Sequence, residues 1–132
     1  MSRLYQAAGI DALEISGSDF NMRKGEKRAF YLPRALEVRD TVSIPLILVG
    51  GIFSREEAER ILDAGIPFVA FSRALICQPD FIARMERGEA SACLQCNSCY
   101  SIYRKRPVRC VRHSAEIPQL KENFQIKTQE ML

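Results

Sequence analysis

One short pattern occurs twice in this chain, and it restricts the fold more than any other feature. The segments AGIDALEIS (8–16) and AGIPFVAFS (64–72) each contain Ala-Gly, an apolar residue and a short β-rich run that ends in Ser. Glycine readily adopts the left-handed conformation that closes many helices, so each copy predicts a helix ending at its glycine. The run that follows each glycine predicts a buried strand.

A third strand is expected between the two copies, in the segment IPLILVGG at 44–51. Pro45 cannot donate a ladder hydrogen bond, so it belongs at the start of the strand. Residues 46–49 are apolar without alternation, which is typical of a parallel strand covered on both faces. Gly50 and Gly51 end this strand.

Helices are expected between and after these strands, over 27–41, 54–64 and 80–87. The second helix has the clearest start, because Ser54 and Glu57 form an S-x-x-E capping box. Pro79 suits the first turn of the third helix, and Gly88 suits its end. Strands that alternate with helices predict an α/β fold with a parallel sheet.

Composition sets limits on the class of protein. The chain has 132 residues, of which 47% are hydrophobic, enough for one domain with a real core. It has no apolar run long enough to span a membrane and no segment typical of a signal peptide, so we expect a cytoplasmic protein without a membrane partner. A net charge of +3 gives little reason to expect a nucleic-acid partner. In a reducing compartment, its five cysteines favour metal binding, redox chemistry or simple burial over disulfides.

Two turns are candidates for binding an anion. VGGIFS and FSRALI both lie where a predicted strand ends and a helix begins, where backbone N–H groups point outward. Gly50 and Gly51 would let the backbone approach a phosphate closely, and the planar guanidinium of Arg73 could clamp it. The alternative is that the glycines only serve a tight turn and that Arg73 is a solvated surface residue. Two such turns on successive parallel strands favour the phosphate site, which the last two loops of (β/α)₈ barrels commonly build.

The cysteines after residue 90 have the spacing C-x₂-C-x₂-C-x₁₀-C, formed by Cys93, Cys96, Cys99 and Cys110. Thiols in this pattern are candidate ligands of an iron–sulfur cluster or of zinc, and the third alternative is that they bind no metal. Cys77 lies apart from the motif and is expected to be a small buried residue. The basic segment YRKRPVR (103–109) is a solvated loop, a source of charge that offsets bound thiolates, or, as a third alternative, a nucleic-acid contact beside a zinc knuckle.

Four motifs in order resemble one known family: GIDALEISGS, IPLILVGGIFSREEAERILDAG, FVAFSRALICQPDF and CLQCNSCY. Over residues 1 to about 110, they are similar to the C-terminal part of the Old Yellow Enzyme group, also called the NADH:flavin oxidoreductase/NADH oxidase family. The resemblance implies a TIM (β/α)₈ barrel that binds FMN, with the three strands as its sixth to eighth. It also implies that Gly50, Gly51, Ser72 and Arg73 hold the FMN phosphate, although Ser72 stands where the family usually has Gly.

The same resemblance implies an activity. NAD(P)H would reduce FMN, and the flavin would pass hydride to a small-molecule substrate such as an activated alkene. Branches similar to 2,4-dienoyl-CoA reductase carry a four-iron (4Fe-4S) cluster just after the barrel. Their cysteine spacing has one more residue in the second and in the last interval than this chain has.

Chain length leads to a further expectation. A complete barrel needs about 250 residues, and three strands leave open edges. We therefore expect a fragment, with the C-terminal part of an FMN-binding barrel at 1–90, a cysteine-rich segment at 91–116 and a polar tail at 117–132. Its partner would be the missing N-terminal half of the barrel or a second copy. The alternatives are a small zinc or iron–sulfur module with a basic partner-binding tail, and an inactive truncated fragment.

Overall fold

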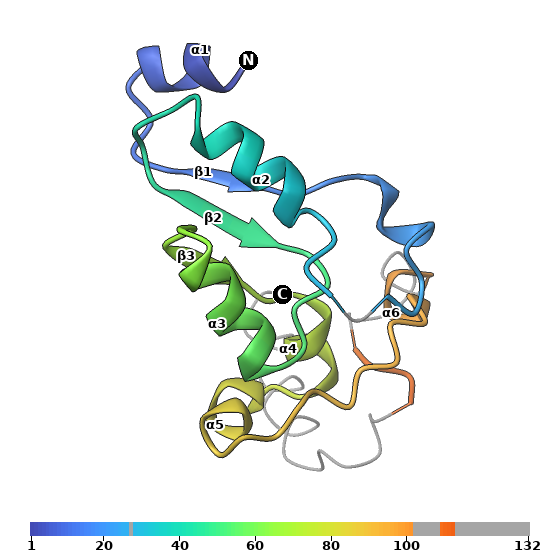
Figure 1. Ribbon diagram of the computed structural model, residues 1–132. Coiled ribbons are helices and arrows are strands. Elements are labelled where there is room, and N and C mark those ends of the chain that lie inside the picture. Colours follow the sequence, from blue (N-terminus) through green and yellow to red (C-terminus); the bar gives the residue numbers. More distant parts are fainter. Residues whose placement is uncertain (27, 102–108, 113–132) are drawn as a thin grey trace, which may run out of the picture.

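The fold is built on a parallel sheet in the order β1-β2-β3, formed by Leu13–Ile15, Leu46–Val49 and Phe68–Ala70. It is seen in a computed structural model that describes residues 1–26, 28–101 and 109–112 (Figure 1). Leu13 lies opposite Leu46, and Val49 lies opposite Ala70. The predicted α/β class and parallel pairing are confirmed, and the arrangement is consistent with part of a barrel.

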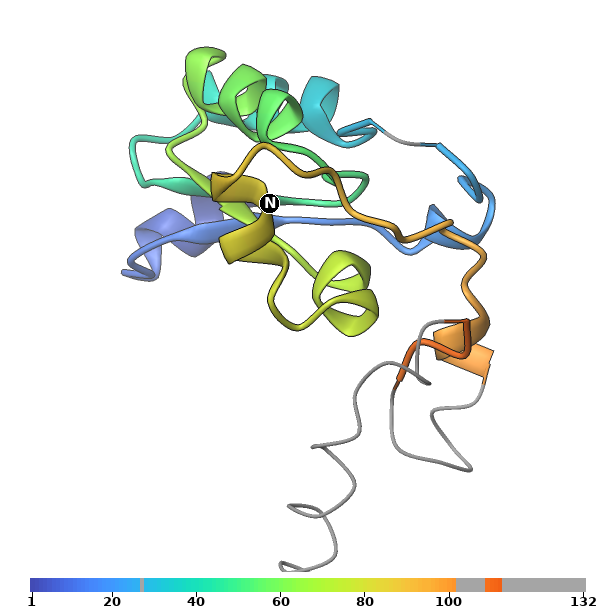
Figure 2. The ribbon, with the colours of Figure 1, turned by 90° about the horizontal axis from the view of Figure 1, so that it is seen from below.

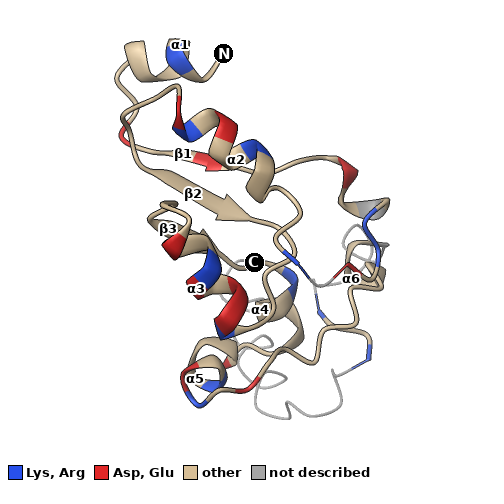
Figure 3. Ribbon diagram, in the orientation of Figure 1, with Lys and Arg blue, Asp and Glu red and all other residues tan. Residues whose placement is uncertain are grey.

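Helices precede and follow these strands. Their bounds are α1 Ser2–Ala7, the 3₁₀ helix η1 Asp19–Asn21, α2 Leu32–Arg39, α3 Arg55–Asp63, α4 Arg73–Cys77, α5 Phe81–Glu86 and α6 Ser98–Ser101. Helices α2 and α3 lie side by side on one face of the sheet (Figure 2). Acidic and basic residues are interleaved along α3 (Figure 3), and all of them except the half-buried Glu57 are exposed. None of the helices in the described ranges is long and apolar enough to cross a membrane.

The repeated Ala-Gly pattern forms the same turn in both places. Gly9 and Gly65 have φ angles of 85° and 84°, in the left-handed region. After α3, the N–H of Gly65 donates to the carbonyl of Leu62, and the N–H of Ile66 donates to that of Ile61. This pair of bonds is a Schellman motif, and the equivalent pair closes α1. The predicted helix–Gly–strand repeat is therefore confirmed, with its glycines in the expected role.

The core lies between the sheet and helices α2 and α3. Leu46 and Leu48 of β2 are buried, together with Ile61 of α3 and Ile66 before β3. Burying each such side chain stabilises the fold by about 1.5–3 kcal/mol. The alternate residues of β2 are half-buried, so within the described chain one face of this strand is fully covered and the other only partly. The predicted cover on both faces is therefore complete on one face and partial on the other.

The helix predicted over 27–41 is shorter than expected. It begins at Leu32, with a proline in its first turn, and ends at Arg39. Residues 28–31 instead form turns that lie against the loop after β2, and Lys27 lies outside the described residues. The prediction included Phe30 in the helix because it is an apolar residue at roughly helical spacing. In the structure Phe30 lies before the helix, and tertiary packing buries it.

The predicted cap of α3 is half confirmed. The hydroxyl of Ser54 accepts a hydrogen bond from the N–H of Glu57 at 3.3 Å. A complete capping box would return the Glu57 carboxylate to Ser54. That carboxylate instead accepts a hydrogen bond from the N–H of Ala29 and pairs with Arg60 at 2.7 Å. A carboxylate in the first turn of α3 thus binds the segment that precedes α2.

Candidate functional site

The two candidate anion-binding turns leave the sheet side by side. Val49 and Ala70 are opposite each other in the β2–β3 ladder, and they are the last residues of their strands. The Gly50-Gly51 turn therefore begins next to the segment that leads to Ser72 and Arg73. The carboxyl ends of parallel strands in barrels are where active sites are built.

Gly50 and Gly51 are required where they stand. Both have positive φ angles, 115° and 81°. A Cβ on Gly50 would lie 2.7 Å from the ring of Tyr31, and a Cβ on Gly51 would overlap the backbone carbonyl of Arg28. The chain itself, through residues 28–31, thus fills the space that the missing side chains leave. Within the described ranges, the backbone N–H groups of both glycines donate to no backbone carbonyl.

Tyr31 lies between the loop that follows β1 and the loop that follows β2. Its ring would contact a Cβ on either Gly17 or Gly50, and its hydroxyl donates a hydrogen bond to Asp19. Burial, followed by this hydrogen bond, raises the pKa of Tyr31 to about 12. The positive charge of Arg73 opposes that rise, which places Arg73 within electrostatic range of the ring.

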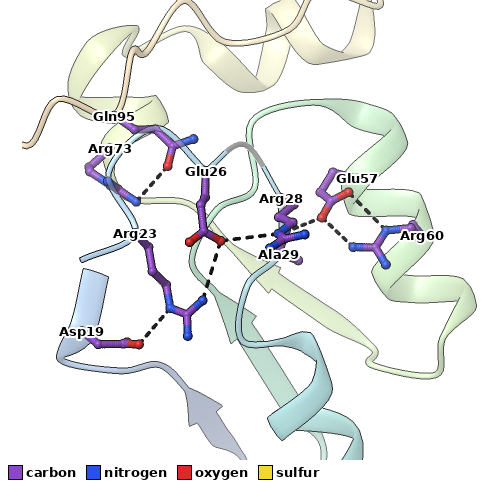
Figure 4. A network of polar contacts seen from close by, with 9 residues as sticks. All are labelled: Asp19, Arg23, Glu26, Arg28, Ala29, Glu57, Arg60, Arg73 and Gln95. Atoms are coloured by element: carbon purple, nitrogen blue, oxygen red, sulfur yellow. Dashed lines mark hydrogen bonds and ion pairs between the residues drawn. The ribbon is translucent and has the colours of Figure 1, made fainter. Parts of the chain in front are cut away.

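Arg73 is buried, with 6% of its surface exposed. Its Nη1 donates to Oδ1 of Asn97 at 2.6 Å. Its Nη2 lies 3.5 Å from Oε1 of Gln95, a contact drawn in Figure 4. The guanidinium carbon lies 5.7 Å from the ring centroid of Phe53. No carboxylate of the described residues is within ion-pairing distance of it. The alternative of a solvated surface arginine is wrong.

Ser72 is also engaged by the chain that follows the barrel segment. Its hydroxyl lies 3.1 Å from the hydroxyl of Tyr100, and it makes no side-chain cap on α4. The ring of Tyr100 packs against Phe20, with centroids 4.9 Å apart, and the Asn97 amide donates to the carbonyl of Phe20. The cysteine-containing segment 93–101 therefore docks across the carboxyl edge of the sheet, between the loops after β1 and β3.

Gln95 and Asn97 are residues that sequence reasoning missed. Both adopt positive φ angles, 52° and 60°, which non-glycine residues rarely do. Gln95 is fully buried, and its Nε2 has no hydrogen-bond partner within the described chain. The only sequence signal for these residues was their position between cysteines.

The cysteines gather around one small cavity of about 20 Å³. Its lining includes the four motif residues Cys93, Cys96, Cys99 and Cys110, and also Cys77. The prediction that Cys77 is buried is confirmed, but the prediction that it lies away from the other cysteines is wrong, because it lines the same cavity as they do, in contact with Cys110. Burial, followed by this contact, raises the pKa of Cys77 to about 12.

The pKa values of Cys93, Cys96 and Cys99 are shifted in different directions. Hydrogen bonds from Ser98, together with Arg112, lower the pKa of Cys96 to about 7, whereas burial raises the pKa values of Cys93 and Cys99. Thiolates are the form that binds soft metals, so the donor chemistry fits iron or zinc. In the described positions, however, no three Cys, His, Asp or Glu side chains are grouped closely enough to hold one metal ion. Most of the basic segment 103–109 and the whole tail 117–132 lie outside the described residues.

Comparison with known proteins gives a consistent group of relatives. A family model described as dihydrouridine synthase (Dus) matches residues 1–130. The chain is 37% identical over 101 residues to the 4,4'-dithiodibutanoate disulfide reductase of Rhodococcus erythropolis, an alignment that covers 71% of this chain and 25% of that protein. It is 33% identical to the bilirubin reductase of Mediterraneibacter gnavus, over 74% of this chain and 17% of the relative.

A third relative is the NADH oxidase of Thermoanaerobacter brockii, 30% identical over 75% of this chain and 16% of that protein. The chain thus spans a quarter or less of the length of these three relatives. No solved structure was found to match it.

Proposed function

Because the chain belongs to the dihydrouridine synthase family, within the Old Yellow Enzyme-like superfamily of flavin oxidoreductases, we propose that it contributes the FMN-phosphate site of an NAD(P)H-dependent enzyme. The superfamily that the four sequence motifs predicted is confirmed by these relatives. The dihydrouridine synthase family is flavin-dependent, and a relative in Bacillus subtilis is named as a probable NADH-dependent flavin oxidoreductase, which supports reading the chain as part of an oxidoreductase. The phosphate form of the flavin, the site residues and the acceptor are the proposal.

One observation carries the phosphate site: a buried arginine whose hydrogen-bond partners are neutral. Arg73 follows β3 directly, and its described partners are the amide oxygens of Asn97 and Gln95. A buried charge without a counter-charge is costly, so such a group is expected where an anion completes the site. A phosphate would supply that counter-charge and accept bidentate hydrogen bonds from the guanidinium.

The remaining donors come from the neighbouring turn. The free N–H groups of Gly50 and Gly51 suit an anion, because nothing in the described backbone competes for them. Ser72 would contribute its N–H, since Tyr100 already engages its hydroxyl. When bound, FMN would supply hydride transfer from NAD(P)H to an acceptor, while these residues hold its phosphate and thereby orient it.

For the acceptor, we propose an activated alkene or a similar small molecule. The relatives are named for different acceptors, including a disulfide and bilirubin, so their names do not point to a single substrate. Strands β1 and β3 each pair on one side only within the described sheet. Further barrel strands, from the rest of the protein or from a second copy, would pair there, and we place the enzyme in the cytoplasm.

Flavin binding tests the proposal. The purified protein is titrated with FMN and, separately, with riboflavin, which lacks the phosphate, and the dissociation constants are read from flavin fluorescence. FMN is expected to bind more tightly, and Arg73→Met is expected to weaken FMN binding about tenfold or more while leaving riboflavin unchanged. Equal affinity for the two flavins would contradict a phosphate site.

The shared cavity of the cysteines favours a second role, metal binding by Cys93, Cys96, Cys99 and Cys110. Since their described positions are not grouped for one ion, this role requires the segment to close further around the metal. Metal analysis and an absorption spectrum of protein purified without oxygen separate iron–sulfur, zinc and bare thiols. A metal-free, colourless protein would rule this role out.

A further inference from the structure

The candidate phosphate arginine is held by the cysteine-containing segment and not by the sheet from which it emerges. Arg73 stands at the start of α4, yet both described hydrogen-bond partners of its guanidinium lie 22 and 24 residues further along the chain. Phe53, after β2, adds the ring over which the cation lies. The orientation of Arg73 therefore depends on the turn that contains Gln95 and Asn97.

The chemistry of these partners matters as much as their position. Asn97 and Gln95 offer amide oxygens, which accept hydrogen bonds without carrying charge. A carboxylate in either place would form an ion pair with Arg73 and cancel the charge that a phosphate needs. Neutral acceptors fix the guanidinium and leave its charge available to an anion.

Gln95 carries a second, independent sign of an absent ligand. It is fully buried, and its Nε2 has no hydrogen-bond partner among the described residues, although its Oε1 faces Arg73 (Figure 4). Leaving a buried donor unpaired is destabilising, so a ligand that accepts this hydrogen bond is favoured. The donor and the guanidinium belong to one polar cluster.

We propose that Gln95 and Asn97 are positioning residues for Arg73, and that Gln95 also donates to the phosphate of the bound flavin. The inference rests on the proposed function and deepens it. The segment between the cysteines makes the site selective for a phosphorylated flavin over the same flavin without its phosphate.

The test is a substitution that changes charge and almost nothing else. Gln95→Glu replaces the unpaired Nε2 with oxygen, so it removes no hydrogen bond found in the described structure. The new carboxylate would pair with Arg73 and repel phosphate. Gln95→Met is the neutral companion, since it keeps the length of the side chain without the amide. Gln6→Glu is the matched control for added charge: Gln6 belongs to α1, which lies far from α4 (Figure 1), and its Oε1 accepts a hydrogen bond from the N–H of Ser43.

FMN and riboflavin dissociation constants are measured for all four proteins, with folding checked by circular dichroism. Gln95→Glu is expected to weaken FMN binding about tenfold or more, Gln95→Met less, and Gln6→Glu not at all, with riboflavin unchanged throughout. The inference would be overturned if the Gln95 variants lose affinity for FMN and riboflavin equally, or lose none. A wild type that still prefers FMN would then leave the phosphate site standing. A wild type that does not prefer FMN would overturn both.

Discussion

The carboxylate of Glu57 on α3 accepts a hydrogen bond from the backbone N–H of Ala29, 28 residues earlier in the chain (Figure 4). The same carboxylate pairs with Arg60. This contact fastens residues 28–31 to α3, and the carbonyl of Arg28 in that segment lies where a side chain on Gly51 would be. One glutamate therefore holds the segment that covers the turn after β2.

Glu57→Ala is expected to lower the free energy of unfolding by about 1–3 kcal/mol, because it leaves the N–H of Ala29 without its partner. Glu59→Ala is the control, since Glu59 lies on the same helix and its pair with Arg55 is exposed. That pair is worth about 0.3–0.5 kcal/mol. Urea unfolding followed by circular dichroism measures both variants. Equal effects would show that the Ala29 contact adds nothing to stability.

The same contact predicts a dependence on pH. Burial opposes ionisation of Glu57, but the hydrogen bonds from Arg60 and Ala29 outweigh burial and lower the pKa of Glu57 below its ordinary value. A lowered pKa in the folded state means that the stabilisation is present above the unfolded pKa, about 4.3, and is lost as pH falls below it. Melting temperatures of the wild type and Glu57→Gln are expected to converge between neutral pH and pH 3. If the difference in melting temperature between the two proteins does not change with pH, ionised Glu57 does not supply this stabilisation.

Gly51→Ala is expected to be more destabilising than its backbone conformation alone explains. A left-handed residue other than glycine costs about 1–2 kcal/mol, and here the added Cβ also meets the carbonyl of Arg28. Gly88→Ala separates the two causes, because Gly88 has a similar φ of 83° and nothing within 4 Å of an added Cβ. Chemical unfolding of both variants gives the difference. If Gly88→Ala lowers the free energy of unfolding by as much as Gly51→Ala does, the close approach of the Arg28 carbonyl to Gly51 does not contribute to the loss of stability.

Tyr31→Phe is expected to raise the pKa of Asp19. The hydrogen bond from Tyr31 is the largest cause that lowers the pKa of this carboxyl, and Arg23 is the next. Arg23→Gln is expected to raise the pKa of Asp19 as well, because it removes a hydrogen bond and a positive charge. An NMR titration of the Asp19 side chain in the three proteins checks both rises, and an unchanged pKa in Tyr31→Phe would contradict the role of its hydrogen bond.

Sequence and structure agree where a feature is local. The turns at Gly9 and Gly65 were predictable because a Schellman motif needs only a helix end and a residue that accepts positive φ. The start of α2 was not, because residues 28–31 are held by Glu57 from a different helix. The local spacing of apolar residues cannot indicate a contact with a distant helix.

The site shows the same division. Arg73 was predictable from its place after a strand, but its partners were not. Gln95 and Asn97 become significant only through contacts with a residue more than 20 positions away. Cys77 was separated from the other cysteines in sequence, yet the fold brings it to Cys110, 33 residues later. Whether the four motif cysteines hold a metal stays a prediction.

The docking of segment 93–101 across the sheet has a consequence for the order of events during synthesis. All three strands leave the ribosome before this segment does, so Arg73 acquires its hydrogen-bond partners only after the strands beside it can have paired. Until then its side chain is not fixed and the edge of the sheet is uncovered. Of the residues that build this site, those of segment 93–101 are therefore synthesised last.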